Sequence, residues 1–152
     1  MANNLPNLQV GQFVKSPWLT PVRVVADSNQ SGTYFNGQNN NGVGATFTYA
    51  TGTLTIDSVL VKLYDRVLLS TQTNGWEAGI YICIVEGVTG VSAVLQRAAD
   101  WQNIEQIFCG QYVSVAAGTT YAGSIWTFVE PMPAHFGVSS ATAENDIVWL
   151  QV

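Results

Sequence analysis

The sequence predicts an all-β fold: a compact antiparallel β-sandwich or barrel of about nine short strands, preceded by an extended N-terminal arm. Apolar and polar residues alternate along short segments such as 45–49 and 53–57, which is the period of a strand with one buried face. Clusters of Gly, Asn, Asp or Pro separate these segments at turn spacing. The chain has 152 residues, of which 47% are hydrophobic, so one domain with a core of ordinary size is expected.

Residues 1–20 are expected to form an extended arm, and residues 21–152 a single β domain. Three prolines occur by residue 21, and proline lacks the N–H donor of a sheet ladder and fixes φ. The arm is nevertheless too apolar to remain in water, so we expect it to pack on a protein surface. A neighbouring protein is the favoured surface, and its own domain is the alternative. The candidate assembly residues of the arm are Leu8, Val10, Phe13, Val14, Trp18 and Leu19.

In the first half of the domain, short strands are expected on either side of a polar loop at 36–42. This loop consists of Asn, Gln and Gly residues, and Asn and Gly tolerate left-handed backbone angles. A turn is expected at 73–76. The predicted strands of this half are 22–26, 45–49, 53–57 and 66–70.

In the second half, the segment 79–86 is apolar at almost every position, as expected for a central strand with both faces covered. The segment 91–96 is expected to return antiparallel to it. A helical turn fits only at 98–107, and only a short one. The remaining predicted strands are 111–115 and 124–129, paired around a turn at 118–120, and a final strand at 146–152.

Charged residues make up only 10% of the chain, against about 25% in an ordinary soluble protein. Such a surface suits dense packing against other subunits, although low charge also accompanies β-rich composition. The net charge is −5 and the Lys and Arg residues are scattered, so nucleic-acid binding is not expected. No apolar stretch approaches the ~18 residues of a membrane helix, and we expect no secretion signal at the N-terminus.

No catalytic site, metal site or cofactor is expected. His135 is the only histidine, and neither a serine elbow nor a reactive-cysteine motif is present. The spacings of metal ligands are also absent. Cys83 and Cys109 lie in apolar runs, and we expect both to be reduced and buried. A disulfide between them is the alternative, because the sequence does not give the distance between their Cα atoms.

Four charged residues flank strand-like segments in a chain that otherwise avoids charge. Asp65 precedes the predicted strand 66–70 and Arg66 begins it. Arg97 and Asp100 follow the predicted strand 91–96. A charge near a core is costly unless it is paired. We therefore hypothesise a structural Arg–Asp bridge between the two segments, with Arg97 and Asp65 as the favoured pair.

Aromatic residues provide the candidates for a binding surface, because exposed rings stack on sugars or anchor interfaces. Trp126 and Trp149 lie on regular strands and are interpreted as core residues. The candidates for a surface or glycan contact, which flank turns, are Trp76, Trp101 and Tyr121. The loop 36–42 is interpreted as a solvated tip; the alternative is that its amides hydrogen-bond a glycan.

Six short motifs follow one another along the chain. They are G-A-T-F at 44–47, L-T-I-D at 54–57, D-R-V-L at 65–68, G-I-Y at 79–81, R-A-A-D at 97–100 and G-T-T at 118–120. In this order and spacing they resemble a β-rich module of bacteriophage tail fibres and related virion surface proteins, over about residues 22–130. Tyr64 stands where that pattern usually has Gly, and Ala78 where it usually has Asn. The resemblance supports a structural role for the charged residues, because D-R and R-A-x-D belong to the pattern.

The resemblance implies a structural protein of the phage virion that performs no catalysis. The favoured function is a decoration or cement subunit held on the particle by its N-terminal arm, because one domain without a shaft or repeats suits a separately encoded subunit. The alternative is a tail-fibre or tail-tip module that binds a host receptor or surface glycan. The expected partners are other capsid or tail proteins, in a virion assembled in the host cytoplasm. A homotrimer is expected on the resemblance alone.

Overall fold

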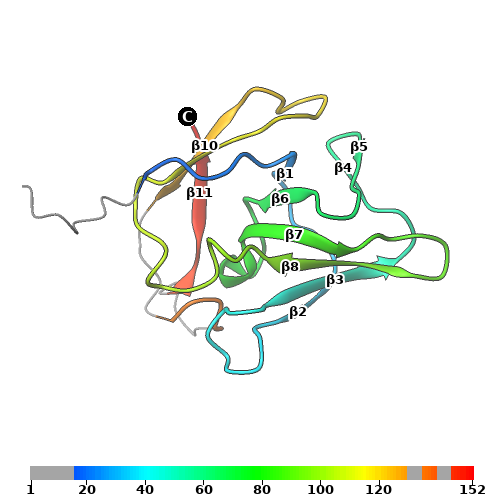
Figure 1. The fold of residues 1–152 in the computed structure, drawn as a ribbon, viewed down its shortest axis with the longest axis horizontal. Helices are drawn as coiled ribbons and strands as arrows, with labels where there is room; N and C mark the ends of the chain where they lie inside the picture. Colours follow the sequence, from blue (N-terminus) through cyan, green and yellow to red (C-terminus); the bar gives the residue numbers. More distant parts are fainter. Residues whose placement is uncertain (1–15, 130–134, 140–144) are drawn as a thin grey trace, which may run out of the picture.

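The structure is a computed structural model that describes residues 16–129, 135–139 and 145–152 (Figure 1). The described residues form eleven strands and one short 3-10 turn, η1 (Gly75–Glu77), so the predicted all-β fold is confirmed. Each of the nine predicted strands has a counterpart. The two additional strands, β2 (Thr33–Phe35) and β5 (Val59–Leu60), are too short to show an alternating pattern.

The larger sheet has six strands in the order β1–β6–β7–β8–β3–β2 (Figure 1). Their bounds are β1 Val24–Ala26, β6 Arg66–Leu69, β7 Gly79–Val85, β8 Ser92–Arg97, β3 Thr46–Thr51 and β2 Thr33–Phe35. All neighbours in this sheet are antiparallel except β1 and β6, so the predicted antiparallel arrangement is wrong at this pair. Parallel neighbours need a long crossover, and here the chain between β1 and β6 forms β2 to β5.

The smaller sheet has three antiparallel strands in the order β11–β10–β9. Their bounds are β9 Tyr112–Ser114, β10 Ile125–Val129 and β11 Val148–Gln151. A separate hairpin joins β4 (Thr55–Ile56) to β5. Its two turn residues, Asp57 and Ser58, both have positive φ, at 46° and 65°, as a tight two-residue hairpin turn requires.

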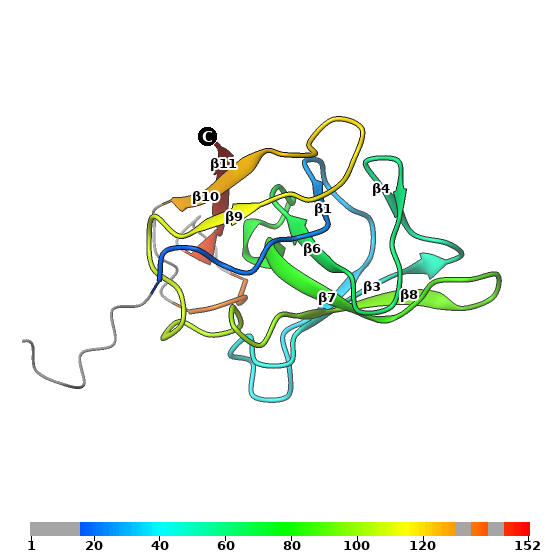
Figure 2. The same cartoon turned by 45° about the horizontal axis from the view of Figure 1, so that its top comes forward.

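One extended segment links the two sheets (Figure 2). The N–H of Leu19 donates to the carbonyl of Tyr112 over 2.8 Å, and the N–H of Val22 donates to that of Ser114 over 2.9 Å, so this segment runs beside β9. The N–H of Arg23 then donates to the carbonyl of Arg66 over 2.7 Å, and β1 continues beside β6. The described end of the predicted arm therefore pairs with its own domain.

The side chains at this end of the arm differ in exposure. Leu19 packs against the core, whereas Trp18 is 56% exposed and lies against the ring of Tyr112 with ring centroids 5.4 Å apart. The other four candidate assembly residues, Leu8, Val10, Phe13 and Val14, lie outside the described residues.

The core consists of two clusters on opposite faces of the larger sheet. Along β7, Ile80 belongs to the cluster shared with the smaller sheet, and Tyr81 and Cys83 belong to the other. The prediction of a central strand covered on both faces is thus confirmed for residues 79–83, whereas Ile84 and Val85 at its end are exposed. The first cluster contains Trp101, Trp126, Phe128 and Trp149. The second contains Phe47 and Leu95 and is covered in part by Ile56 of the β4–β5 hairpin.

Two local predictions are wrong. The segment 98–107 contains turns and bends but no helix. Cys83 is buried, and burial, with the nearby carboxylates of Asp65 and Glu86, raises the pKa of its thiol. Cys109 is exposed and not buried as predicted, because it lies in the turn before β9. Both cysteines are free.

Candidate functional site

The predicted bridge between Arg97 and Asp65 is wrong, because each residue has other partners. Asp65 accepts from Nη1 of Arg23 over 3.1 Å. The bridge between the two predicted segments joins Arg66 and Asp100 instead, through two hydrogen bonds of 2.8 and 2.9 Å. This two-pronged geometry is the strong form of an Arg–carboxylate pair.

Arg97 is buried and has no carboxylate partner among the described residues. Its Nη1 donates to the carbonyl of Ala78 over 2.8 Å, and its Nη2 donates to the carbonyl of Trp76 over 3.2 Å and to the hydroxyl of Tyr34 over 3.1 Å. The guanidinium carbon also lies 4.6 Å from the ring centroid of Phe136, which is a cation–π distance. Carbonyl dipoles and aromatic faces therefore take the place of a counter-ion.

This arrangement has an electrostatic consequence. Burial disfavours the charged guanidinium, but the neighbouring Tyr81 and Tyr34 outweigh that effect and raise the pKa of Arg97. Because its contacts come from β2, from η1 and from the segment that carries Phe136, Arg97 fixes three separate parts of the chain in one place.

The prediction of an exposed Trp101 is wrong, because its side chain is fully buried. Its ring contacts those of Phe128, Phe136 and Trp149, with centroids 5.1 to 5.6 Å apart, and its Nε1 donates to Gln111. Trp126 and Trp149 are core residues, as predicted. The interior of the smaller sheet is thus built from aromatic residues.

The other two aromatic candidates are partly buried. Trp76 lies in η1, where its carbonyl accepts from Arg97. Tyr121 packs its ring against Trp126 and donates from its hydroxyl to Asp27 over 2.9 Å. Their observed contacts are therefore structural ones.

Three segments that are distant in the sequence meet at one end of the molecule: the loop 36–44, residues 102–106 and residues 135–137. Nδ2 of Asn36 donates to the carbonyl of Phe136 over 3.1 Å, and the N–H of Gly44 donates to Oε1 of Gln102 over 3.1 Å. Gly42 has φ +87°, and a Cβ there would collide with the ring of Phe136. Because Asn36, Gly37 and Gly42 are buried, the interpretation of the loop 36–42 as a solvated tip holds only for residues 38–41.

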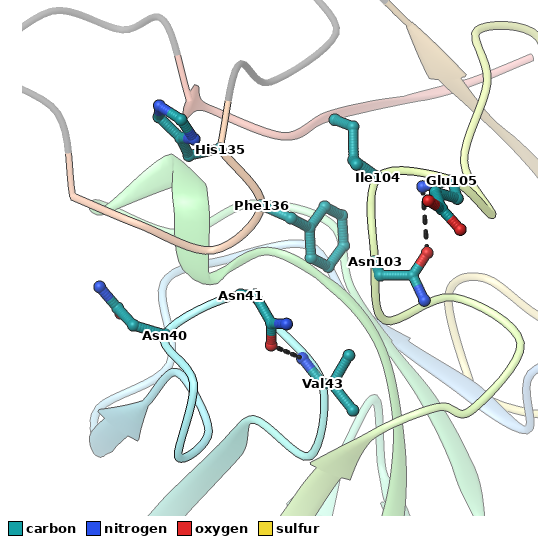
Figure 3. Close-up of a pocket in the computed structure, with 8 residues that line it drawn as sticks. All are labelled: Asn40, Asn41, Val43, Asn103, Ile104, Glu105, His135 and Phe136. Atoms are coloured by element: carbon teal, nitrogen blue, oxygen red, sulfur yellow. Dashed lines mark hydrogen bonds between the residues drawn. The ribbon is translucent and has the colours of Figure 1, made fainter.

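These three segments line a partly open pocket of about 370 Å³, here called the amide pocket (Figure 3). Its lining residues are Asn40, Asn41, Val43, Asn103, Ile104, Glu105, His135 and Phe136. Figure 3 shows the ring of Phe136 between the asparagine loop and the segment 103–105. Val43 and Ile104 are each 41% exposed and supply apolar walls.

The three asparagines of the amide pocket share one feature: each uses its Oδ1 within the protein. Oδ1 of Asn41 accepts the N–H of Val43 over 3.2 Å, and Oδ1 of Asn103 accepts the N–H of Glu105 over 3.0 Å. Oδ1 of Asn40 accepts from Nδ2 of Asn36 over 3.2 Å. Since a backbone N–H only donates, it fixes which end of the Asn41 and Asn103 amides faces it. Within the described chain no partner occupies the Nδ2 groups, so they remain available as donors.

Sequence reasoning singled out the loop 36–42 but missed the rest of the amide pocket. Asn103, Ile104 and Glu105 lie in the segment where a short helical turn is expected, and the sequence does not single out Phe136. The polar composition of the loop 36–42 was the one usable signal of the pocket. Nothing in the local sequence indicates which other segments this loop contacts.

A second pocket is lined by Asp27, Asp57 and Tyr121 among others, and these side chains make structural hydrogen bonds. Asp57 accepts the backbone N–H groups of Thr120 and Tyr121 over 2.9 to 3.0 Å, and Asp27 accepts the hydroxyl of Tyr121. Both carboxylates are therefore already satisfied. Across residues 16–129, 135–139 and 145–152, no group of three His, Cys, Asp or Glu residues is placed to hold a metal, and no helix is long and apolar enough to span a membrane.

The side of the smaller sheet that faces away from the core is here called the outer face. Because side chains alternate along a strand, the residues between the buried ones define it. They are Tyr112, Ser114, Ile125, Thr127, Val129, Val148 and Leu150, with Trp18 beside Tyr112. None of them is charged, and Leu150 is 54% exposed.

Comparisons with known proteins identify no relative of this chain. No protein-family model, no curated protein and no solved structure matches it. The class of protein that the fold and the two surfaces define is a small all-β domain with an uncharged outer face and a polar pocket.

Proposed function

We propose that this protein is a non-enzymatic structural subunit of a bacteriophage virion, a decoration or cement protein held on the particle surface through its N-terminal segment and the outer face. The observation that carries the proposal is the outer face itself. It is uncharged, it contains exposed apolar side chains, and it begins at Trp18, where the N-terminal segment joins the sheet.

The chemistry of this face suits contact with another protein. Trp18, Tyr112, Thr127 and Leu150 follow one another across neighbouring strands, because Tyr112 pairs with Thr127 and Thr127 pairs with Leu150. Large side chains of this kind, free of charge, are typical of the centre of an interface. The low overall charge reduces repulsion between closely packed subunits.

The partners in this proposal are other capsid or tail proteins, the subunit itself forms a homotrimer, and its place is the virion. The resemblance of the six sequence motifs to virion surface modules supports these points. The outer face supports the requirement for a protein partner.

The test compares two leucine variants of the full-length protein. Leu150→Gln places an amide on the outer face, and Leu63→Gln makes the same change at a leucine that is 44% exposed and lies outside that face. Particles produced with each variant are purified, and the bound subunit is quantified. We expect Leu150→Gln to reduce incorporation and Leu63→Gln to leave it unchanged, with both free subunits folded. Equal incorporation of both variants would contradict the proposal.

The second candidate function is a tail-fibre or tail-tip module that binds a host receptor or surface glycan. The amide pocket favours it, because it presents unused hydrogen-bond donors on the surface. Gold labelling of intact particles with an antibody against the subunit distinguishes the two functions: label on the head supports decoration, and label restricted to the tail supports the receptor module.

A further inference from the structure

We propose that the amide pocket binds a neutral saccharide unit through the Nδ2 groups of Asn40, Asn41 and Asn103. This inference does not depend on whether the subunit lies on the head or on the tail. It rests on the shape of the pocket, the orientation of its amides and its apolar walls.

The pocket is held in shape by the protein. Phe136, its floor, is buried between the ring of Trp101, at 5.3 Å, and the guanidinium of Arg97, at 4.6 Å. The hydrogen bond from Asn36 to the carbonyl of Phe136 fixes the asparagine loop against this floor. A binding site fixed in this way loses little conformational entropy when a ligand enters.

The donors select the ligand. Because each Oδ1 is used inside the protein, the amides offer N–H groups and require acceptor oxygens from the ligand. Sugar hydroxyl and ring oxygens supply several acceptors on one small molecule. The C–H groups of the sugar ring can contact Val43 and Ile104.

The volume of the pocket and the charge of the protein restrict the class of ligand further. A volume of about 370 Å³ lies near the lower end of the range for small-molecule pockets, which suits one or two sugar rings. The chain has a net charge of −5, so an acidic sugar is repelled.

The test uses NMR of the full-length protein labelled with nitrogen-15, in which side-chain amide groups give their own signals. The probes are glucose, galactose, N-acetylglucosamine and galacturonic acid, each added up to roughly 50 mM so that binding of millimolar order is detected. We expect at least one neutral sugar to shift the Nδ2 signals of Asn41 and Asn103, and galacturonic acid to bind more weakly.

Three matched variants make the result specific. Asn41→Asp and Asn103→Asp keep the Oδ1 acceptor that holds the loop but remove the Nδ2 donor, and each is expected to weaken binding about tenfold. Asn39→Asp introduces the same charge on an exposed residue of the same loop, outside the pocket lining, and is expected to change affinity less than about twofold.

Three outcomes would overturn the inference: no shift with any neutral sugar, tighter binding of galacturonic acid than of every neutral sugar, or equal losses in all three variants. The particle test with Leu150→Gln is independent of this one, so either proposal can fail while the other stands.

Discussion

The Nη2 group of Arg97 donates to the hydroxyl of Tyr34 over 3.1 Å, which joins the last residue of β8 to the edge strand β2. The same guanidinium also donates to the carbonyls of Ala78 and Trp76. A charged side chain in the interior thus connects the larger sheet to η1 and to the floor of the amide pocket, with no carboxylate among its described contacts.

Replacement of Arg97 by Lys should lower the free energy of unfolding by about 2–4 kcal/mol. A single ammonium cannot reach three acceptors in different directions, and it loses the contact of the guanidinium with the ring of Phe136. Urea unfolding at pH 7 measures the change. Arg23→Lys is the control, because Arg23 is a half-exposed partner of Asp65, and its effect should stay within about 0.5 kcal/mol. Equal effects of the two variants would contradict the assigned role of Arg97.

Replacement of Gly79 by Ala should destabilise the protein by at least about 3 kcal/mol. Gly79 has φ +139°, and its Cβ would collide with Nη1 of Arg97 and with the ring of Trp101. Gly52→Ala is the matched control, since Gly52 has φ +122° and nothing within 4 Å of its Cβ position. The control should cost only the backbone strain, about 1–2 kcal/mol. A smaller loss for Gly79→Ala than for Gly52→Ala would show that the close packing is unimportant.

Replacement of Tyr64 by Gly should stabilise the protein by up to about 1 kcal/mol. Tyr64 has φ +68° and is 75% exposed, so the change relieves a strained backbone and removes little packing. Its neighbour Leu63 has no positive φ, and Leu63→Gly should be destabilising. Thermal or urea unfolding of the two variants measures both signs. Destabilisation by Tyr64→Gly would mean that the exposed ring makes a stabilising contact.

The stability supplied by Asp57 should depend on pH. Partial desolvation raises the pKa of Asp57, but the backbone N–H groups of residues 119–121 outweigh it and hold the pKa below its ordinary value. A lowered pKa in the folded protein means that the contribution is complete above the ordinary carboxyl pKa of about 3.9 and is lost as the pH falls through the folded value.

Comparison of the wild type with Asp57→Asn tests this dependence. The urea midpoint of the wild type should exceed that of Asp57→Asn at pH 7, and the difference should shrink as the pH falls below about 4. A difference that is unchanged between pH 7 and pH 3 would show that the ionised carboxylate does not hold the 119–121 loop.

Local patterns were sufficient to predict most of the strands. The alternation at 45–49 predicted β3, and the apolar run at 79–86 predicted a central strand with two covered faces. These signals are local because a strand places successive side chains on opposite faces whatever lies beside it. The parallel pairing of β1 with β6 has no such signal, since it depends on where the intervening chain returns.

The charged and aromatic residues show the limit of this reasoning. The sequence predicted a structural role for Asp65, Arg66, Arg97 and Asp100. It did not predict that Arg66 pairs with Asp100, or that Arg97 lies among aromatic rings. It likewise placed Trp101 in a loop without revealing that the loop folds into the core. The distance between two side chains depends on how remote segments pack, and that information is not contained in either segment.

By itself, therefore, the amino-acid sequence determined the all-β class, the approximate strand positions and the low content of charged residues, because periodicity and composition are local properties of a chain. Only the tertiary structure decided the partner of each charge, the burial of Trp101 and the existence of the amide pocket. The amide pocket, for example, exists only where residues 36–44, 102–106 and 135–137 meet, and their meeting is set by the packing of remote segments.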